Sequence, residues 1–317
     1  MNDLKVAVAQ FQPENGDKKY NLSVIENLTA LARDQGADAV SFHELCITAY
    51  TFLKDLEVPQ LKQLAEPVPG GPSCRYLVEL ARQYQIVILA GLLEIEHNRF
   101  YNTYVCVDGH GLKARYRKIH PFINKYLSAG DEYVLFNLHH WKCGILICYD
   151  NNVIENVRAT TLLGADVIFA PHVTGCTPSP MPGRGYVDDS IWQNREHNPE
   201  ALRKEFDGRK GREWLLRWLP ARSYDNGVYY VFTNPIGYDG DQLKNGNSMI
   251  IDPFGDIMTE IRGFDDSIAM AVLTPEKLKQ AGGYRYRNAR KPELYRDILG
   301  QDHQAVLKPV WMKNSAE

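Results

Sequence analysis

Short apolar segments alternate with amphipathic segments along most of the chain, and this pattern predicts strands mixed with helices. Apolar or β-branched runs typical of strands lie at 5–11, 37–44, 86–92, 104–107, 113–117, 142–148, 166–170, 228–233, 248–251 and 268–273. Helical spacing of apolar residues is found at 21–33, 76–84 and 153–163. Because the connections include both crossovers and a hairpin over 108–111, we expect mixed sheets covered by helices.

Two segments do not follow this pattern. Residues 175–212 are rich in proline, glycine and charge, which predicts a long loop that could act as a pocket wall or lid. From about residue 275 the sequence is polar and irregular, and a subunit-interface segment and a loose tail both remain open. With no linker or repeat, we expect one domain over 1–275, including the 175–212 insertion, and a tail over 276–317.

Composition narrows the function without naming it. The 317 residues carry a net charge of −3 and are 44% hydrophobic, so nothing favours nucleic acid or an anionic membrane as partner. No apolar run reaches the about 18–20 residues of a membrane span, and the first residues do not resemble a secretory signal. The six cysteines form no C-x-x-C pair, so we expect no metal site and a cytoplasmic protein with reduced thiols.

Three residues with useful chemistry follow predicted strands. Cys148 closes the run 142–148 just before a helical pattern, where the strand would hold the thiol and the helix end would favour its thiolate. Glu44 follows the apolar part of the second strand, and Lys118 follows the strand at 113–117. Sites in α/β proteins gather at strand ends. Each residue alone has a commoner structural interpretation: a buried core cysteine, a surface carboxylate and a solvated basic run.

Read together with their neighbours, these residues resemble the nitrilase superfamily, the carbon–nitrogen hydrolases that use Glu, Lys and Cys. The similar blocks, in order, are 6–10, then 101–103 with 116–120, then 148–150 with Glu155, Arg158 and 164–166, then 221–226, and finally 252–255. The resemblance implies a four-layer αββα sandwich, often dimerised into an eight-layered particle. It also implies catalysis without a metal or organic cofactor, and a homodimer or higher homo-oligomer.

The same resemblance implies roles for individual residues. Cys148 would attack a carbonyl or nitrile carbon, and Glu44 would act as general base and later activate water against the thioester. Lys118 would lower the thiol pKa and stabilise the oxyanion, with the backbone N–H of Tyr149 as a second donor. We further expect Asp150, with Glu155 and Arg158, to steady the helix after the cysteine.

The chain departs from the family's pattern at two places. Many members carry a second Glu shortly after the lysine block, and here Asn124 stands near that position. An amide there could bind substrate but could not transfer protons. His172 follows a strand whose end often shapes the pocket in this family, and a substrate contact and a structural hydrogen bond are both open.

The hypothesis is therefore a hydrolase that cleaves a small amide or N-carbamoyl compound through a cysteine thioester, releasing ammonia or an amine. The alternative within the family is a nitrilase that converts a nitrile to a carboxylic acid and ammonia. A third possibility is a non-catalytic scaffold of the same fold. The substrate itself is not indicated by the sequence.

Overall fold

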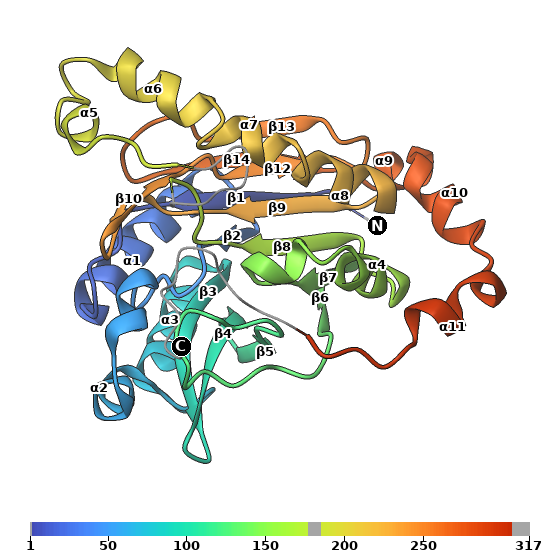
Figure 1. Ribbon diagram of the computed structural model, residues 1–317, viewed down its shortest axis with the longest axis horizontal. Helices are drawn as coiled ribbons and strands as arrows, with labels where there is room; N and C mark the ends of the chain where they lie inside the picture. Colours follow the sequence, from blue (N-terminus) through green and yellow to red (C-terminus); the bar gives the residue numbers. More distant parts are fainter. Residues whose placement is uncertain (1, 177–184, 306–317) are drawn as a thin grey trace.

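The computed structural model describes residues 2–176 and 185–305, which form two stacked sheets with helices on both outer faces (Figure 1). Within these residues each sheet has six strands. The first has the order β14-β1-β2-β3-β4-β5, with bounds Ser267–Leu273, Leu4–Gln10, Ala39–Ser41, Val87–Glu96, Arg99–Asp108 and Gly111–Arg117. The second has the order β13-β12-β9-β8-β7-β6, with bounds Ile257–Glu260, Met249–Ile251, Tyr229–Thr233, Val167–Pro171, Trp141–Ile145 and Leu135–Leu138.

Both sheets have a parallel centre and antiparallel edges. β1, β2 and β3 pair in parallel, as do β7, β8 and β9, whereas the outer strands pair antiparallel. Parallel neighbours require crossover connections, and helices supply them. Helices α1 (Lys18–Asp34) and α3 (Pro72–Tyr84) cover the first sheet, while α4 (Ile154–Leu162) and α8 (Leu219–Asn226) cover the second. The expected αββα sandwich is confirmed.

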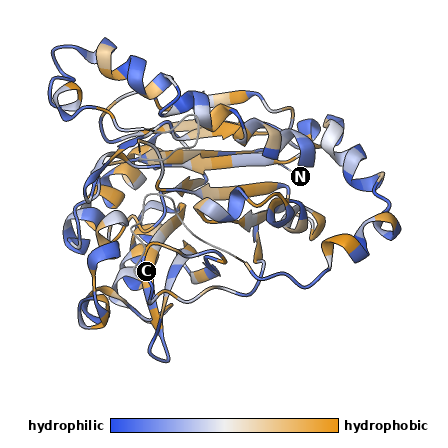
Figure 2. Cartoon of the chain, viewed as in Figure 1, coloured by the Kyte–Doolittle hydropathy of each residue, from blue (hydrophilic) through white to orange (hydrophobic). Residues whose placement is uncertain are grey.

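Alternation along β1 shows how the layers are held. Val6 and Val8 pack into the core between the two sheets, whereas Ala7 and Ala9 face the helices that cover the first sheet. Side chains alternate across a strand, so one strand contributes to both cores. Hydrophobic residues accordingly concentrate along the strands, and polar residues on the outer surface of the helices (Figure 2).

The segment expected to be a loop at 175–212 is largely helical where it is described. It contains α5 (Asp189–Gln193), α6 (Pro199–Asp207) and the start of α7 (Arg212–Leu216). The side chains of Asp188 and Asn198 cap α5 and α6. The prediction of a long loop was wrong for these residues because several of the polar and proline residues start helices, whereas the role as a pocket wall or lid stays a prediction. Residues 177–184 of this segment lie outside the described residues.

The C-terminal segment is also more regular than expected. It forms α9 (Pro275–Gln280), α10 (Gly282–Asn288), a 3₁₀ turn η3 (Pro292–Leu294) and α11 (Arg296–Leu299), and α11 lies away from the sheets (Figure 1). Lys277 of α9 anchors the segment through a 2.6 Å ion pair with Asp252. Residues 306–317 of the expected tail lie outside the described residues.

Three smaller elements complete the fold near the strand ends. They are a 3₁₀ turn η1 (Thr51–Asp55), helix α2 (Val58–Leu64), and a hairpin of β10 (Ile236–Asp239) and β11 (Gln242–Asn245) that the sequence pattern did not indicate. Every helix across residues 2–176 and 185–305 is too short or too polar to cross a membrane.

Candidate active site

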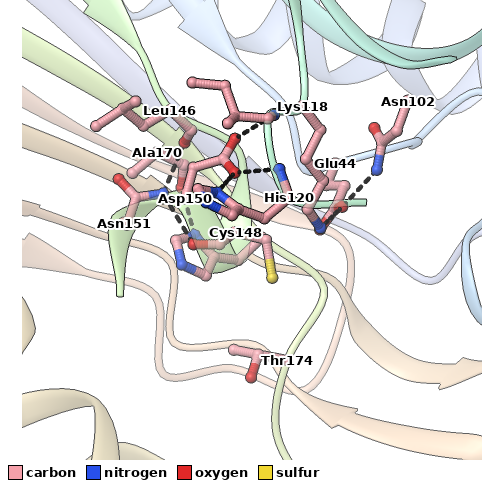
Figure 3. Close-up of polar contacts among 12 residues, drawn as sticks. Glu44, Asn102, Lys118, His120, Leu146, Cys148, Asp150, Asn151, Ala170 and Thr174 are labelled. Carbon is pink, nitrogen blue, oxygen red and sulfur yellow. Dashed lines mark hydrogen bonds and ion pairs between the residues drawn. The ribbon is translucent and has the colours of Figure 1, made fainter. Parts of the chain in front are cut away.

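Glu44 and Lys118 form a buried ion pair where the first sheet ends. Lys118 directly follows β5, Glu44 lies three residues beyond β2, and neither side chain is exposed. The Lys118 Nζ to Glu44 Oε1 distance is 2.6 Å, and Asn102 Nδ2 donates to the same oxygen at 2.6 Å (Figure 3). Among the described residues Glu44 Oε2 has no partner at normal hydrogen-bond distance, and a side-chain interaction between Glu44 and the Cys148 thiol acts on the pKa of both groups. One carboxylate oxygen is thus fixed, and the other remains able to accept a proton.

Cys148 lies beside this pair, in a turn rather than on a strand. β7 ends at Ile145, and Cys148 begins the 3₁₀ turn η2 (Cys148–Asn151) with a positive φ of 47°. This is the left-handed region, which non-glycine residues seldom adopt and which clusters at functional sites. Cys148 is 8% exposed, and its thiol is close enough to Glu44 and Lys118 for both charges to act on its pKa. The structure therefore brings the three sequence-predicted residues together (Figure 3).

Asp150 joins the cysteine turn to the lysine segment. Its fully buried carboxylate accepts hydrogen bonds from the Tyr116 hydroxyl at 2.8 Å and from the backbone N–H groups of Ile119 and His120. The same carboxylate lies 2.8 Å from His120 Nδ1. It therefore braces residues 119–120 against Cys148 rather than capping α4, and that expectation was wrong. Glu155 is exposed, and Arg158 donates to the backbone of Asp225.

The other side of the turn is held by Asn151 and Arg222. Asn151 Nδ2 donates to the carbonyls of Leu146 and Cys148, and its Oδ1 accepts from the Tyr230 hydroxyl. Arg222 of α8 donates to the carbonyls of Asn151 and Asn152. Several buried hydrogen bonds thus hold the unusual backbone conformation at Cys148 in place.

Burial determines the resting protonation of the site. It raises the pKa of Cys148 to about 12, assisted by the charge of Glu44 and opposed by Lys118 and a backbone hydrogen bond from Val173. Burial also raises the pKa of Glu44, which Lys118 partly offsets. For Lys118, burial is the largest single influence and opposes the charge, but Glu44 together with Tyr50, Cys148 and Asp150 raises the pKa well above its usual value.

The thiol therefore rests in its neutral form and needs a base before it can attack. The expectation that a helix N-terminus would favour the thiolate was wrong. Burial was not visible in the sequence, and α4 begins only at Ile154. Lys118 does lower the thiol pKa, as expected, but its effect is smaller than that of burial.

Two further residues face the pair and were not identified from the sequence. Asn102 orients Glu44, and the only signal for it was a polar residue inside a strand that is otherwise buried. Tyr50 is 3% exposed, and its ring centre lies 5.3 Å from Lys118 Nζ. Its hydroxyl has no hydrogen-bond partner among the described residues, and the charges of Lys118, Glu44 and Cys148 all act on it. No feature of the sequence around Tyr50 indicated this position.

The remaining predicted site residues differ in their surroundings. Tyr149 is 38% exposed, and its ring packs against Phe122 and His120. Asn124 donates to the carbonyls of Leu53 and Leu56 and accepts from the Tyr126 N–H, so its polar atoms serve the backbone. These contacts do not support a substrate contact by Asn124.

His172 is buried at the end of β8. Its Nδ1 lies 2.9 Å from the Ala170 carbonyl, and its ring packs on Trp218 and Phe232. This geometry accounts for a structural hydrogen bond, one of the two possibilities for this residue.

Comparison with known proteins gives one consistent family. A family model described as carbon-nitrogen hydrolase matches residues 5–282. An (R)-stereoselective amidase from Pseudomonas sp. is 29% identical over 88% of both chains. An N-carbamoylputrescine amidase from Solanum lycopersicum is 27% identical over 96% of this chain and 97% of its own. A nitrilase from Pyrococcus abyssi is 28% identical over 85% of this chain and 89% of its own.

Solved structures show the same architecture. A double mutant of the amidase from Nesterenkonia sp. in complex with acrylamide superposes with a TM-score of 0.69 at 20% identity, covering 93% of this chain and 97% of that one. Another structure of that amidase, also with a TM-score of 0.69 and 20% identity, and covering 93% of this chain and 96% of that one, has the acetamide moiety of fluoroacetamide added to its active-site cysteine. At 20% identity, these structural similarities support the fold and nothing further.

Proposed function

Because the chain belongs to the carbon–nitrogen hydrolase family and is an enzyme that hydrolyses carbon–nitrogen bonds, we propose that Cys148 is its nucleophile, Glu44 its general base and Lys118 its fixed cation. The observation that supports this assignment best is that the two carboxylate oxygens of Glu44 have different surroundings. Lys118 and Asn102 share Oε1, and Oε2 has no partner of its own beside a neutral thiol.

The proposed reaction follows from these protonation states. Glu44 accepts the thiol proton as Cys148 Sγ bonds to the substrate carbon, and the carbonyl oxygen becomes an oxyanion. Lys118, with the Tyr149 backbone N–H as the second donor, stabilises that charge. Glu44 then returns the proton to the departing ammonia or amine, leaving a thioester. Glu44 next deprotonates water, which attacks the thioester, and the proton returns to Cys148 as the acid leaves.

We propose small amides and N-carbamoyl compounds as substrates. Amidase and carbamoyl amidase are the names of relatives that align over most of this chain. The nitrilase alternative is favoured by the Pyrococcus abyssi relative, and the same thiol could attack a nitrile carbon. We expect ammonia release from matched amide, carbamoyl and nitrile panels to be highest with the first two classes. Turnover of nitriles alone would reject this choice.

A trapped intermediate tests the mechanism more directly. Rapid acid quenching during turnover should leave an acyl adduct on the peptide that contains Cys148, detected by mass spectrometry. An adduct on Cys176, which is also buried and free, would place the nucleophile elsewhere. The Cys176→Ser variant is the matched control and should retain the adduct at Cys148.

We also propose that the enzyme is a homodimer and that the tail over 276–317 joins the partner beyond a catalytic domain over 1–275. On η3 and α11, Leu294, Ile298 and Leu299 are 64–70% exposed. Large apolar side chains that protrude together favour a protein interface. Sedimentation should give a dimer, and Ile298→Glu with Leu299→Glu should give a monomer. Wild-type monomers at micromolar concentration would reject the interface.

The six free cysteines support a cytoplasmic location, where thiols stay reduced. Fractionation of cells that express the untagged chain should place its activity in the cytoplasmic fraction. Activity confined to an oxidising compartment would reject this location.

A further inference from the structure

Thr233 ends β9 and is a fully buried residue that the proposed mechanism does not use. Its hydroxyl donates a hydrogen bond to the carbonyl of Phe42 at 2.7 Å. Phe42 directly follows β2 and precedes Glu44 by two residues. A side chain of the second sheet is therefore bonded to the segment of the first sheet that carries the proposed base.

The backbone of Thr233 reaches the segment beside the proposed nucleophile. Its carbonyl accepts from the His172 N–H at 2.7 Å. Val173, the next residue along the chain, bonds the Cys148 sulfur through its backbone. Thr233 thus contacts both the segment that carries the base and the segment that touches the thiol.

Asn234, which follows Thr233, strengthens the second of these contacts. It accepts from the Thr174 N–H at 2.8 Å and donates to the Thr174 carbonyl at 3.1 Å. Thr174 lies on the side to which the Cys148 sulfur points (Figure 3). The end of β9 therefore holds residues 172–174 in place beside the thiol.

The two sheets hold their reacting groups by separate contacts. Lys118 and Asn102 bind Glu44 Oε1 from the first sheet and its extension. Asn151 and Arg222 hold the Cys148 turn from the second sheet and the helix that covers it. Each set stays on its own side, so neither sets the distance between the base and the thiol.

Contacts that cross between the sheets are needed for that. Asp150 of the Cys148 turn accepts from the Tyr116 hydroxyl of β5 at 2.8 Å, which joins the sheets on the Lys118 side. The bond from Thr233 to Phe42 joins them on the Glu44 side. A buried hydrogen bond is directional, so it fixes relative position more closely than apolar packing does.

We propose that Thr233 is a positioning residue, and that its hydrogen bond to the Phe42 carbonyl sets the distance over which Glu44 takes the proton from Cys148. This inference rests on the proposed function and adds a residue that acts through the base. Proton transfer requires heavy atoms within about 2.6–3.2 Å of each other. A misplacement of about 1 Å costs on the order of 100-fold in rate.

The competing explanation is that Thr233 only satisfies a buried carbonyl. The Tyr104 hydroxyl of β4 already donates to the Phe42 carbonyl at 2.5 Å, so that carbonyl is paired without Thr233. Tyr104 belongs to the same sheet as β2, and its bond does not cross to the second sheet. The two donors share an acceptor and differ in what they join, which separates the explanations.

The test removes the Thr233 hydroxyl with little change in shape. In Thr233→Val, kcat per active site for the fastest amide of the panel should fall on the order of 10-fold, with KM changed less than about twofold. Alkylation of Cys148 by iodoacetamide should slow by a similar factor, because it also requires removal of the thiol proton. Thr233→Ser keeps the hydroxyl and should restore both rates to within about threefold of the wild type.

Thr161→Val is the matched control. Thr161 is 1% exposed, and its hydroxyl donates to the Val157 carbonyl at 2.8 Å within α4. It should leave both rates within about twofold of the wild type. Tyr104→Phe removes the donor that stays within one sheet, and should slow alkylation less than Thr233→Val does. An equal or larger effect of Tyr104→Phe would overturn the proposal.

The proposal also fails if Thr233→Val raises KM while alkylation keeps its wild-type rate, or if both rates per active site are unchanged. Should Thr233→Val not fold, Thr233→Ala and Thr233→Ser differ only by the hydroxyl and give the same comparison. Equal alkylation rates in those two variants would overturn the proposal. Absence of ammonia from every substrate in the wild-type enzyme would instead reject the proposed function.

Discussion

The cysteine turn and the β10–β11 hairpin hold their polar groups in different ways. Around Cys148, buried groups such as Asp150 and Asn151 make several hydrogen bonds each, mostly to the backbone of residues that follow β5 and β7. The hairpin is a separate two-stranded sheet, and the connection from α6 to α7 that packs on it carries a partly exposed ion pair, Lys210–Glu205. The reacting groups are thus built into the core of the fold, whereas the hairpin lies outside the two large sheets and meets the site through the hydrogen bonds of Asp239 to the Tyr50 and Thr51 backbone.

Cys148→Ala tests the chemical side of this comparison and should have the largest effect. Turnover should fall by at least about 10⁴-fold, because no other group supplies the covalent step. The melting temperature should stay close to that of the wild type, since the small side chain is replaced by a smaller one at a single site. Ammonia assays and thermal melts measure the two quantities. Normal turnover in this variant would remove the nucleophile from the mechanism.

Lys118→Met should lower the free energy of unfolding more than any substitution in the hairpin. It leaves Glu44 buried without its cation, and breaking a buried pair costs about 3–5 kcal/mol. Glu44→Gln together with Lys118→Met should recover most of that loss because no unpaired charge remains. Urea unfolding of the wild type, both single variants and the double variant gives the coupling. An additive double variant would mean that the pair does not act as a unit.

His43 should make the free energy of unfolding decrease in acid. Burial lowers its pKa to about 3, and neither ring nitrogen has a hydrogen-bond partner among the described residues. The unfolded chain binds a proton near pH 6.5, so stability should fall as pH drops from about 6.5 toward 3, by up to ~1.4 kcal/mol per pH unit. Other groups titrate in both proteins, so the difference between wild type and His43→Gln isolates this slope in urea unfolding. Parallel pH profiles would contradict the prediction.

Tyr50→Phe should have the smallest effect and sharpens the boundary between the two regions, since Tyr50 contacts both. The hydroxyl has no partner to lose in the free protein, so stability should change by less than about 0.5 kcal/mol. If the hydroxyl binds substrate, kcat/KM should fall about 2–10-fold through one neutral hydrogen bond. Unchanged kinetics would leave Tyr50 a packing residue.

Strand ends were the most predictable part of the site. β-branched runs indicated the central strands, and three chemically useful residues followed such runs, so Glu44, Lys118 and Cys148 could be proposed together. Asn102 and Tyr50 could not, because their relation to the pair depends on strand register and on a turn folding back. Asn102, for example, meets Glu44 58 positions away.

Proline and asparagine are ambiguous signals because they occur both in loops and at the start of helices. Pro199 was one of the prolines that suggested a loop, but it begins α6, with Asn198 as the capping residue. The thiol pKa was misjudged for a different reason. Sequence shows which charges are near Cys148 in the family pattern, but it does not show how completely the fold removes them from water.

The positive φ at Cys148 means that the cysteine occupies a position glycine would fit better. A left-handed residue with a side chain costs on the order of 1–3 kcal/mol, which the surrounding hydrogen bonds must supply. Selection for stability alone would remove the thiol. The protein therefore keeps a reactive side chain at residue 148 and gives up some conformational stability there. Substitutions that stabilise the rest of the turn should offset this cost.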